Sequence, residues 1–349
     1  MQTTLPDTYA YTKPWPSCAR LTWYHGMEAP FRVFGLVRGA SGSYRRLPDG
    51  LAERVNGEVP ALALHTAGGR IRFCTDSGAI AVLVKPLQGG MSPHMPLTGA
   101  TGCDIYVGGV YSYTCKPSDA DGGAYDGVVE KGPGVSLIEI NLPLYNGIAA
   151  LWIGLEDTAR ITPPTPYRMD DPVLFYGSSI TQGGCASRPG NAYPAFLGRW
   201  LNLDHVNLGF SGCGRGEPVM AEYIASLNLS AFVMDYDHNA PTAEHLMATH
   251  ERFFKIVRKA HPRLPVLALS KPDVERDPEF YAARREIIRR TCDRAAAAGD
   301  DRVWFIDGEA LFGTENRDAC TVDGSHPNDL GFLRMAEAIR PVLRRALGV

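Results

Sequence analysis

The chain of 349 residues is longer than one ordinary domain and suits two domains of about 150 to 180 residues each. Hydrophobic residues make up 45% and charged residues 21%, which is the balance of a globular protein and excludes disorder as the dominant state. Lys and Arg number 35 against 38 for Asp and Glu, a net charge of −3. We therefore expect no nucleic-acid partner, because no basic excess is available to neutralise a phosphate backbone.

Signals for targeting and for disulfide bonding are sparse. The N-terminal segment MQTTLPDTYAYTKPWP lacks the basic start and apolar run of a signal peptide. No stretch of about 18 apolar residues follows it, so we expect no membrane partner. The eight cysteines form no CxxC pair, which indicates neither a disulfide scaffold nor a zinc knuckle. A cytoplasmic protein with reduced thiols is the simplest interpretation.

The first half of the chain has the pattern of antiparallel β structure, because short apolar and β-branched runs alternate with turn residues. Ala67-Gly68-Gly69 and Tyr145-Asn146-Gly147 are examples of the turns. No long stretch with helical periodicity interrupts them, which predicts a jelly-roll-like β-sandwich domain over residues 1–160. Its strands are expected at Arg32–Val37, Ile71–Cys74, Ile80–Pro86, Asp104–Val107, Val135–Leu142 and Ala150–Gly154.

Residues 161–171 are predicted to form a stiff connector, since the segment 161–166 holds three prolines. From residue 172 to residue 349, apolar strands alternate with helical segments. This pattern indicates a three-layer α/β/α domain with a parallel sheet, whose ligand site should lie at the carboxyl ends of the strands. The strands are expected at Val173–Tyr176, His205–Phe210, Ala231–Tyr236, Pro265–Ser270 and Val303–Ile306. The helices are expected at Ala192–Leu203, Thr242–Ala260 and Pro278–Ala298, with a last helix capped by Asn328.

Side chains suited to acyl chemistry follow four of these strands. Ser179 comes after the first strand, Gly212 after the second and Asn239 after the third, while Asp323 and His326 follow the last. A serine hydroxyl attacks a carbonyl when an imidazole takes its proton, and the imidazole needs a carboxylate to fix its tautomer. Backbone N–H groups and an amide can stabilise the oxyanion that forms. The four strand ends therefore supply the parts of an acyl-transfer site.

The order of these blocks resembles that of the SGNH (GDSL-type) hydrolase superfamily. The blocks are Gly177-Ser178-Ser179-Ile180-Thr181, Asn207-Leu208-Gly209-Phe210-Ser211-Gly212, Tyr236-Asp237-His238-Asn239 and Asp323-Gly324-Ser325-His326-Pro327. The resemblance covers the whole C-terminal domain and implies a flavodoxin-like α/β/α fold. It also implies a serine esterase mechanism, which requires neither a cofactor nor a metal.

The resemblance assigns roles to individual residues. It implies that Ser179 is the nucleophile, that Asp323 and His326 complete the triad, and that the Ser179 backbone, Gly212 and Asn239 form the oxyanion hole. Two features depart from the family pattern. A serine, Ser178, replaces the aspartate of the usual Gly-Asp-Ser, and Ser179 is chosen because it holds the third place of that block. The third block lacks the usual glycine and second acidic residue.

The N-terminal half carries a resemblance of its own. Gly102-Cys103-Asp104-Ile105-Tyr106, followed by Asn141-Leu142-Pro143-Leu144-Tyr145, looks like the β-sandwich domain with a Gly-x-Asp-Leu-Tyr motif that precedes a subset of SGNH enzymes. The segment 183–190 after the nucleophile fits that subset as well. Members of the group include carbohydrate-type esterases and acyltransferases.

The sequence therefore predicts an esterase that hydrolyses short acyl esters of a sugar or another small polar alcohol. Transfer of the acyl group to an alcohol acceptor is the first alternative, and a non-catalytic glycan-binding protein is the second. Arg188 and His238 are candidate substrate-binding residues, because both lie in predicted active-site loops. The expected partner is a small ester such as an acylated carbohydrate.

Overall fold

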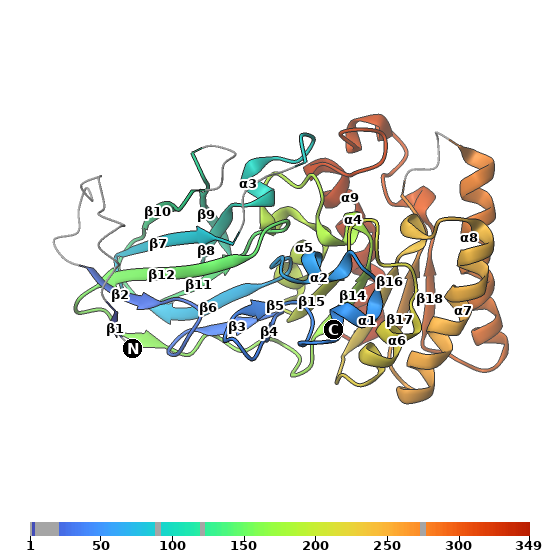
Figure 1. The fold of residues 1–349 in the computed structure, drawn as a ribbon, viewed down its shortest axis with the longest axis horizontal. Helices are drawn as coiled ribbons and strands as arrows, with labels where there is room; N and C mark the ends of the chain where they lie inside the picture. The colour runs from blue at the N-terminus through green and yellow to red at the C-terminus, as the bar shows by residue number, and fades with distance from the viewer. Residues whose placement is uncertain (1, 4–20, 88–91, 119–122, 273–276) are drawn as a thin grey trace.

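The structure of the chain is a computed structural model that describes residues 2–3, 21–87, 92–118, 123–272 and 277–349. Figure 1 shows a β-rich N-terminal part beside an α/β C-terminal part. The antiparallel and parallel sheets predicted for the two halves are both confirmed.

Two antiparallel sheets make up most of the N-terminal part. The first has the order β1 (Gln2–Thr3), β2 (Leu21–His25), β12 (Ile148–Glu156), β7 (Ala79–Pro86) and β10 (Tyr125–Glu130). The second has the order β13 (Ile161–Thr162), β6 (Arg70–Thr75), β11 (Ser136–Asn141), β8 (Cys103–Val107) and β9 (Val110–Cys115), and β3 (Arg32–Phe34) also pairs with β6. A short ribbon joins β4 (Val37–Arg38) to β5 (Tyr44–Arg45). Side chains from both sheets, such as Val82, Ile138 and Ile153, share one buried core.

The C-terminal part is built on a five-stranded parallel sheet. Its order is β15 (His205–Gly209), β14 (Val173–Gly177), β16 (Ala231–Asp235), β17 (Val266–Leu269) and β18 (Val303–Ile306). The first strand in sequence, β14, lies between the second and the third, which is the flavodoxin-like order. The strand order reverses at this point, and ligand sites of such sheets lie beside this point at the carboxyl ends of the strands.

Helices cover both faces of this sheet. Successive strand residues point to opposite faces, so Leu174 and Phe232 enter one core while Phe175 and Val233 enter the other. The first core is closed by α6 (Pro218–Ala225), α7 (Ala243–Ala260) and α8 (Pro278–Ala297). The second is closed by α5 (Tyr193–Leu201) and α9 (Asp329–Leu347), together with the short helix α4 (Ser179–Gln182).

The two parts of the chain are joined by more than a connector. The short helices α1 (Ala52–Val55) and α2 (Val59–Ala63) lie against the α/β part (Figure 1) and share a core with α6 and α7. Arg46 is 1% exposed and donates hydrogen bonds to the carbonyl oxygens of His65 and Gly209, the last residue of β15. A third short helix, α3 (Leu97–Ala100), packs beside the loop that follows α4.

Among the described helices, none has the length and apolar character that crossing a bilayer requires. The cysteines of the described residues, seven in number, are free and buried.

Candidate active site

The turn that carries Ser179 lies between β14 and α4. Ser178 is the N-cap of α4, and its hydroxyl accepts a hydrogen bond from the backbone N–H of Ile180 at 3.1 Å. Ser179 is consequently the first residue of the helix, and its backbone N–H lies outside the helix's own hydrogen bonds. Residue 177, before the cap, must be glycine, because a Cβ at Gly177 would lie 2.3 Å from the carbonyl oxygen of Asp235.

The structure brings Ser179, His326 and Asp323 into one hydrogen-bonded relay. Ser179 Oγ lies 2.9 Å from Nε2 of His326, and Nδ1 of His326 lies 2.8 Å from Oδ2 of Asp323. A carboxylate at Nδ1 holds the proton of the neutral imidazole there, so Nε2 is left as an acceptor facing the serine hydroxyl. This is the tautomer that a general base needs.

The loop that carries His326 is held by hydrogen bonds from its backbone to the side chain of Asp323. Oδ1 of Asp323 accepts the N–H groups of Ser325 at 2.9 Å and of His326 at 2.8 Å. Partial burial opposes ionisation of Asp323, but these bonds and the contact with His326 outweigh it and lower its pKa to about 2. The loop then enters α9, where the predicted cap Asn328 is confirmed: its side chain accepts the N–H of Gly331.

The predicted oxyanion-hole residues lie on the two loops that follow β15 and β16. Gly212 has a φ of +69°, a conformation that favours glycine, and a Cβ there would meet nothing within 4 Å. Asn239 ends a short 3-10 helix, Asp237–Asn239, and its Nδ2 donates to the carbonyl oxygen of Phe210 at 2.8 Å. An amide nitrogen has two N–H donors, so this bond orients the side chain and leaves a second donor for an oxyanion.

Two further side chains hold these loops in place. Gln182 accepts the N–H of Ser211 at 3.1 Å and donates to the carbonyl oxygen of Leu144 at 2.9 Å. Tyr145, from the N-terminal domain, donates its hydroxyl to the carbonyl oxygen of Ser179 at 3.1 Å. The turn that carries Ser179 is therefore held in place from both domains.

The two candidate substrate-binding residues make structural contacts. Arg188 donates to the hydroxyl of Tyr106 at 2.6 Å and lies 3.4 Å from Oδ2 of Asp104, so the structure places it in the contact between the domains. His238 is half-buried, and its Nε2 lies 3.0 Å from Oγ of Ser325 in the loop between Asp323 and His326. Neither position gives direct support to a substrate-binding role.

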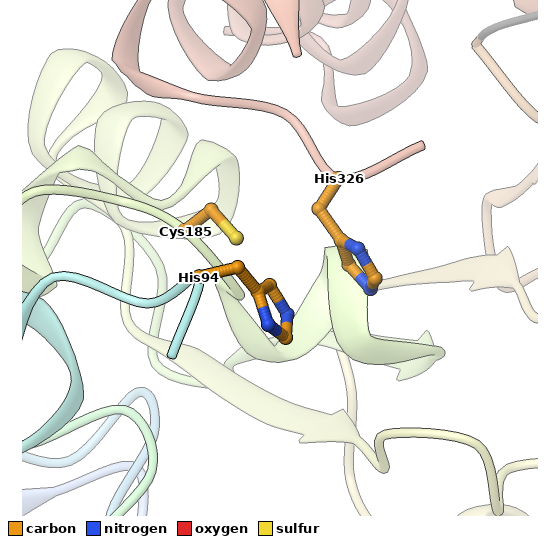
Figure 2. A group of neighbouring side chains, drawn as sticks. All are labelled: His94, Cys185 and His326. Atoms are coloured by element: carbon orange, nitrogen blue, oxygen red, sulfur yellow. The ribbon is translucent and has the colours of Figure 1, made fainter. Parts of the chain in front are cut away.

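One side chain beside the relay, His94, was not predicted from the sequence; Figure 2 shows it together with His326 and Cys185. His94 belongs to the N-terminal domain, is exposed, and has its ring centroid 5.2 Å from that of His326. No sequence signal points to it, because His94 reaches the site only through the packing of α3 on the loop after α4. Cys185 is 3% exposed, and burial together with the charge of Asp323 raises its pKa to about 12.

Behind the relay lies a buried carboxyl group. Asp235, the last residue of β16, accepts the hydroxyl groups of Thr181 in α4 at 2.8 Å and of Tyr193 in α5 at 2.9 Å. Burial and the charge of Asp237 raise the pKa of Asp235 to about 7. This carboxyl group links α4 to the centre of the parallel sheet.

Comparisons with solved structures give a likeness over almost the whole chain. A putative GDSL-like lipase from Bacteroides ovatus is 27% identical with a TM-score of 0.83, covering 94% of this chain and 98% of that one. A salicylyl-acyltransferase from a tetracycline biosynthetic pathway is 24% identical with a TM-score of 0.77, covering 94% and 98%. A family two carbohydrate esterase from Clostridium thermocellum is 13% identical with a TM-score of 0.64, covering 91% and 98%, and shows likeness of fold. No curated protein matches the chain.

Family models match both parts of the chain. The N-terminal domain of SGNH-hydrolase-type esterases, known as GxDLY, matches residues 21–161. The GDSL-like lipase/acylhydrolase family matches residues 170–344, half of the chain. With the resemblance noted in the sequence thus confirmed, the chain belongs to the GDSL-like lipase/acylhydrolase family, a family of carboxylic ester hydrolases, and carries the GxDLY N-terminal domain.

Proposed function

We propose that the chain is a serine esterase that hydrolyses short, acetyl-type acyl esters of a sugar or another small polar alcohol. The observation that carries the proposal is the relay in which Ser179, His326 and Asp323 are joined by hydrogen bonds of 2.9 and 2.8 Å. These distances lie within the reach that a nucleophile, its base and an orienting carboxylate require.

The proposed reaction follows from this relay. Ser179 Oγ attacks the ester carbonyl carbon while its proton passes to Nε2 of His326. The oxyanion is stabilised by the backbone N–H groups of Ser179 and Gly212 and by the amide of Asn239. His326 then gives its proton to the oxygen of the leaving alcohol as that C–O bond breaks. A water molecule attacks the acyl-serine, gives a proton to His326, and releases the carboxylic acid as the proton returns to Ser179.

Support for the substrate class comes from the structural neighbours. They include carbohydrate esterases, one of them solved with a cello-oligosaccharide, and an acetyl xylan esterase from Butyrivibrio proteoclasticus. Their N-terminal and C-terminal parts both align with this chain, since 91% or more of it is covered. A sugar ester is the substrate that this set of neighbours favours.

Acyl transfer is the second candidate, and the structural likeness to a salicylyl-acyltransferase favours it. The same relay serves both reactions, which differ only in the group that attacks the acyl-serine. The rate of acyl-serine breakdown separates them. Rapid breakdown of the acyl-serine in buffer alone supports hydrolysis. Slow breakdown that is accelerated many-fold by an alcohol acceptor, such as a sugar, supports transfer.

A chromogenic acetyl ester tests the proposed function with a matched pair of variants. We expect Ser179→Ala to lower kcat by at least about 10³-fold, since it removes the nucleophile. Ser178→Ala is the control at the neighbouring serine, because it removes only the cap of α4, which costs about 1 kcal/mol of stability and leaves the relay in place. If Ser179→Ala is as active as the wild-type protein, Ser179 is not the nucleophile. If wild type, Ser179→Ala and Ser178→Ala are all inactive but still bind glycan, the binding-protein alternative is favoured.

A further inference from the structure

Two side chains beside the relay, His94 and Cys185, form with His326 a cluster of potential metal ligands. One imidazole nitrogen each of His94 and His326 and the Sγ of Cys185 all lie within 4.8 Å of one another. Figure 2 shows the three side chains converging from different segments. In a tetrahedral zinc site, bonds of about 2.0 to 2.3 Å place such atoms about 3.3 to 3.8 Å apart. A movement of about 1 Å would therefore close the cluster around an ion.

Each of the three residues is presented by a different local structure. Cys185 lies two residues after Gly183, the C-cap of α4, and has a φ of +72°, which few residues other than glycine adopt. Its side chain is 3% exposed and packs with Met95 and Ala100 of the N-terminal domain. The same packing holds His94, the residue before Met95, at the cluster.

His94 is the ligand that can move. Its side chain is exposed, whereas Cys185 is buried and His326 is half-buried in the relay. Rotation of an exposed imidazole costs little, so His94 can take up the distance that an ion requires. The N-terminal domain would thus complete a site that the α/β domain alone cannot form.

We propose that His94, Cys185 and His326 form a binding site for Zn²⁺, and that occupation of this site switches the enzyme off. Two imidazoles and a thiolate are the donor set that zinc favours over magnesium or calcium, which take oxygen ligands. The thiol of Cys185 loses its proton to solvent when the Zn–S bond forms. A water molecule takes the fourth position of the tetrahedron.

Inhibition follows from the two hydrogen bonds that His326 already makes. Its Nε2 faces Ser179 and its Nδ1 faces Asp323, so a Zn²⁺ ion bound at either nitrogen displaces one partner of the relay. At Nε2 the ion separates the base from Ser179, whereas at Nδ1 it displaces Asp323 and leaves the imidazole proton on Nε2. In both cases the serine hydroxyl loses the group that takes its proton. This consequence rests on the proposed function, whereas the binding site itself does not. The ion opposes the reaction, so the expectation that catalysis requires no metal is unaffected.

The inhibition is tested with ZnCl₂ on metal-free enzyme and a chromogenic acetyl ester. We expect loss of activity that EDTA reverses. Cys185→Ser and His94→Ala should each raise the Zn²⁺ concentration for half-inhibition at least about tenfold, because each removes a ligand. Cys292→Ser, at a buried cysteine of α8, and His25→Ala, at an exposed histidine of β2, are the matched controls and should keep the wild-type value.

Binding is tested separately with Co²⁺, which occupies zinc sites and absorbs light when a thiolate is bound. We expect a thiolate-to-metal charge-transfer band in wild-type protein and in Cys292→Ser, and none in Cys185→Ser. The band should weaken in His94→Ala. Because His94 is exposed, we expect this variant to fold normally, so misfolding does not explain a weaker band. The proposal is overturned if the band is missing from wild-type protein or survives in Cys185→Ser. If the wild-type protein shows the band but has no esterase activity, the proposed function is contradicted and the metal site is still supported.

Discussion

At the scale of single residues, Asp323 is the group that sets the protonation state of the relay. Its pKa of about 2 is well below the ordinary value of 3.8, because hydrogen bonds from the His326 loop outweigh the effect of partial burial. The carboxylate therefore stays ionised at neutral and mildly acidic pH. Loss of activity on mild acidification should then not report protonation of Asp323.

Replacement of Asp323 by Asn tests this role. The amide retains the size of the side chain but has no charge, and its NH₂ group can face Nδ1 of His326 and favour the wrong tautomer. We expect kcat to fall by about 10² to 10⁴-fold while the substrate KM changes little. The pH–rate profile of the wild-type protein and of Asp323→Asn measures both effects. A variant with full activity would show that His326 needs no carboxylate partner here.

At the scale of secondary-structure elements, Asp235 links β16 to α4 and α5, and its raised pKa predicts a pH-dependent stability. Between about pH 4 and pH 7 the folded protein keeps a proton on Asp235 that the unfolded chain releases. The stabilisation is complete below pH 3.8 and is lost as the pH rises through about 7. One such group lowers the free energy of unfolding by about 1.4 kcal/mol per pH unit within this window.

The variant Asp235→Asn has no proton to release at this position. Urea denaturation at pH 5, 6 and 7 measures the free energy of unfolding of both proteins. The value for wild type minus that for Asp235→Asn should fall by about 1 kcal/mol per pH unit as the pH rises. Asp126→Asn, on β10 of the other domain, serves as a control with the wild-type slope. Parallel slopes for wild type and Asp235→Asn would contradict the raised pKa.

Most elements could be predicted from the sequence, and the omissions have identifiable causes. Each expected strand is present within a few residues, but β2, β9 and β10 were not predicted. β9 was missed although Gly108-Gly109 precedes it. Both glycines have positive φ, at +58° and +82°, which is the signal of a two-residue hairpin turn. The short helix α6 was also overlooked, because eight residues carry little periodicity.

The residues of the candidate site likewise fall into those that could be predicted from the sequence and those that could not. Ser179, Gly212, Asn239, Asp323 and His326 could be chosen because they follow parallel strands, and the topology alone brings strand ends together. The residues that reach the site from the N-terminal domain, namely Arg46, His94 and Tyr145, could not be placed. Their positions depend on how two separate sheets pack, and residue spacing within one domain carries no information about that packing.

At the scale of the whole molecule, the two domains share buried polar contacts around Asp104 of β8. This carboxyl group is fully buried and accepts the amide of Asn141 and the backbone N–H of Gly190, both at 2.8 Å. Arg188 reaches the same carboxyl group, and its guanidinium lies 3.9 Å from the ring centroid of Tyr111 on β9. The Asp of the N-terminal motif therefore holds the loop that follows α4.

This arrangement predicts that a change in the N-terminal domain reduces both stability and catalysis. Asp104→Ala leaves the N–H of Gly190 without its acceptor and the guanidinium of Arg188 without its carboxylate, which should cost about 3 kcal/mol. Because the loop from Gly190 back to Cys185 borders the relay, we expect kcat to fall as well. Calorimetry should show one transition at a lower Tm, since Arg46 and α1 join the domains into one cooperative unit. The matched variant Asp126→Ala, on β10 of the same domain, should keep the wild-type Tm and kcat. Two separate transitions in Asp104→Ala, with unchanged kcat, would show that the N-terminal domain folds and acts apart from the catalytic one.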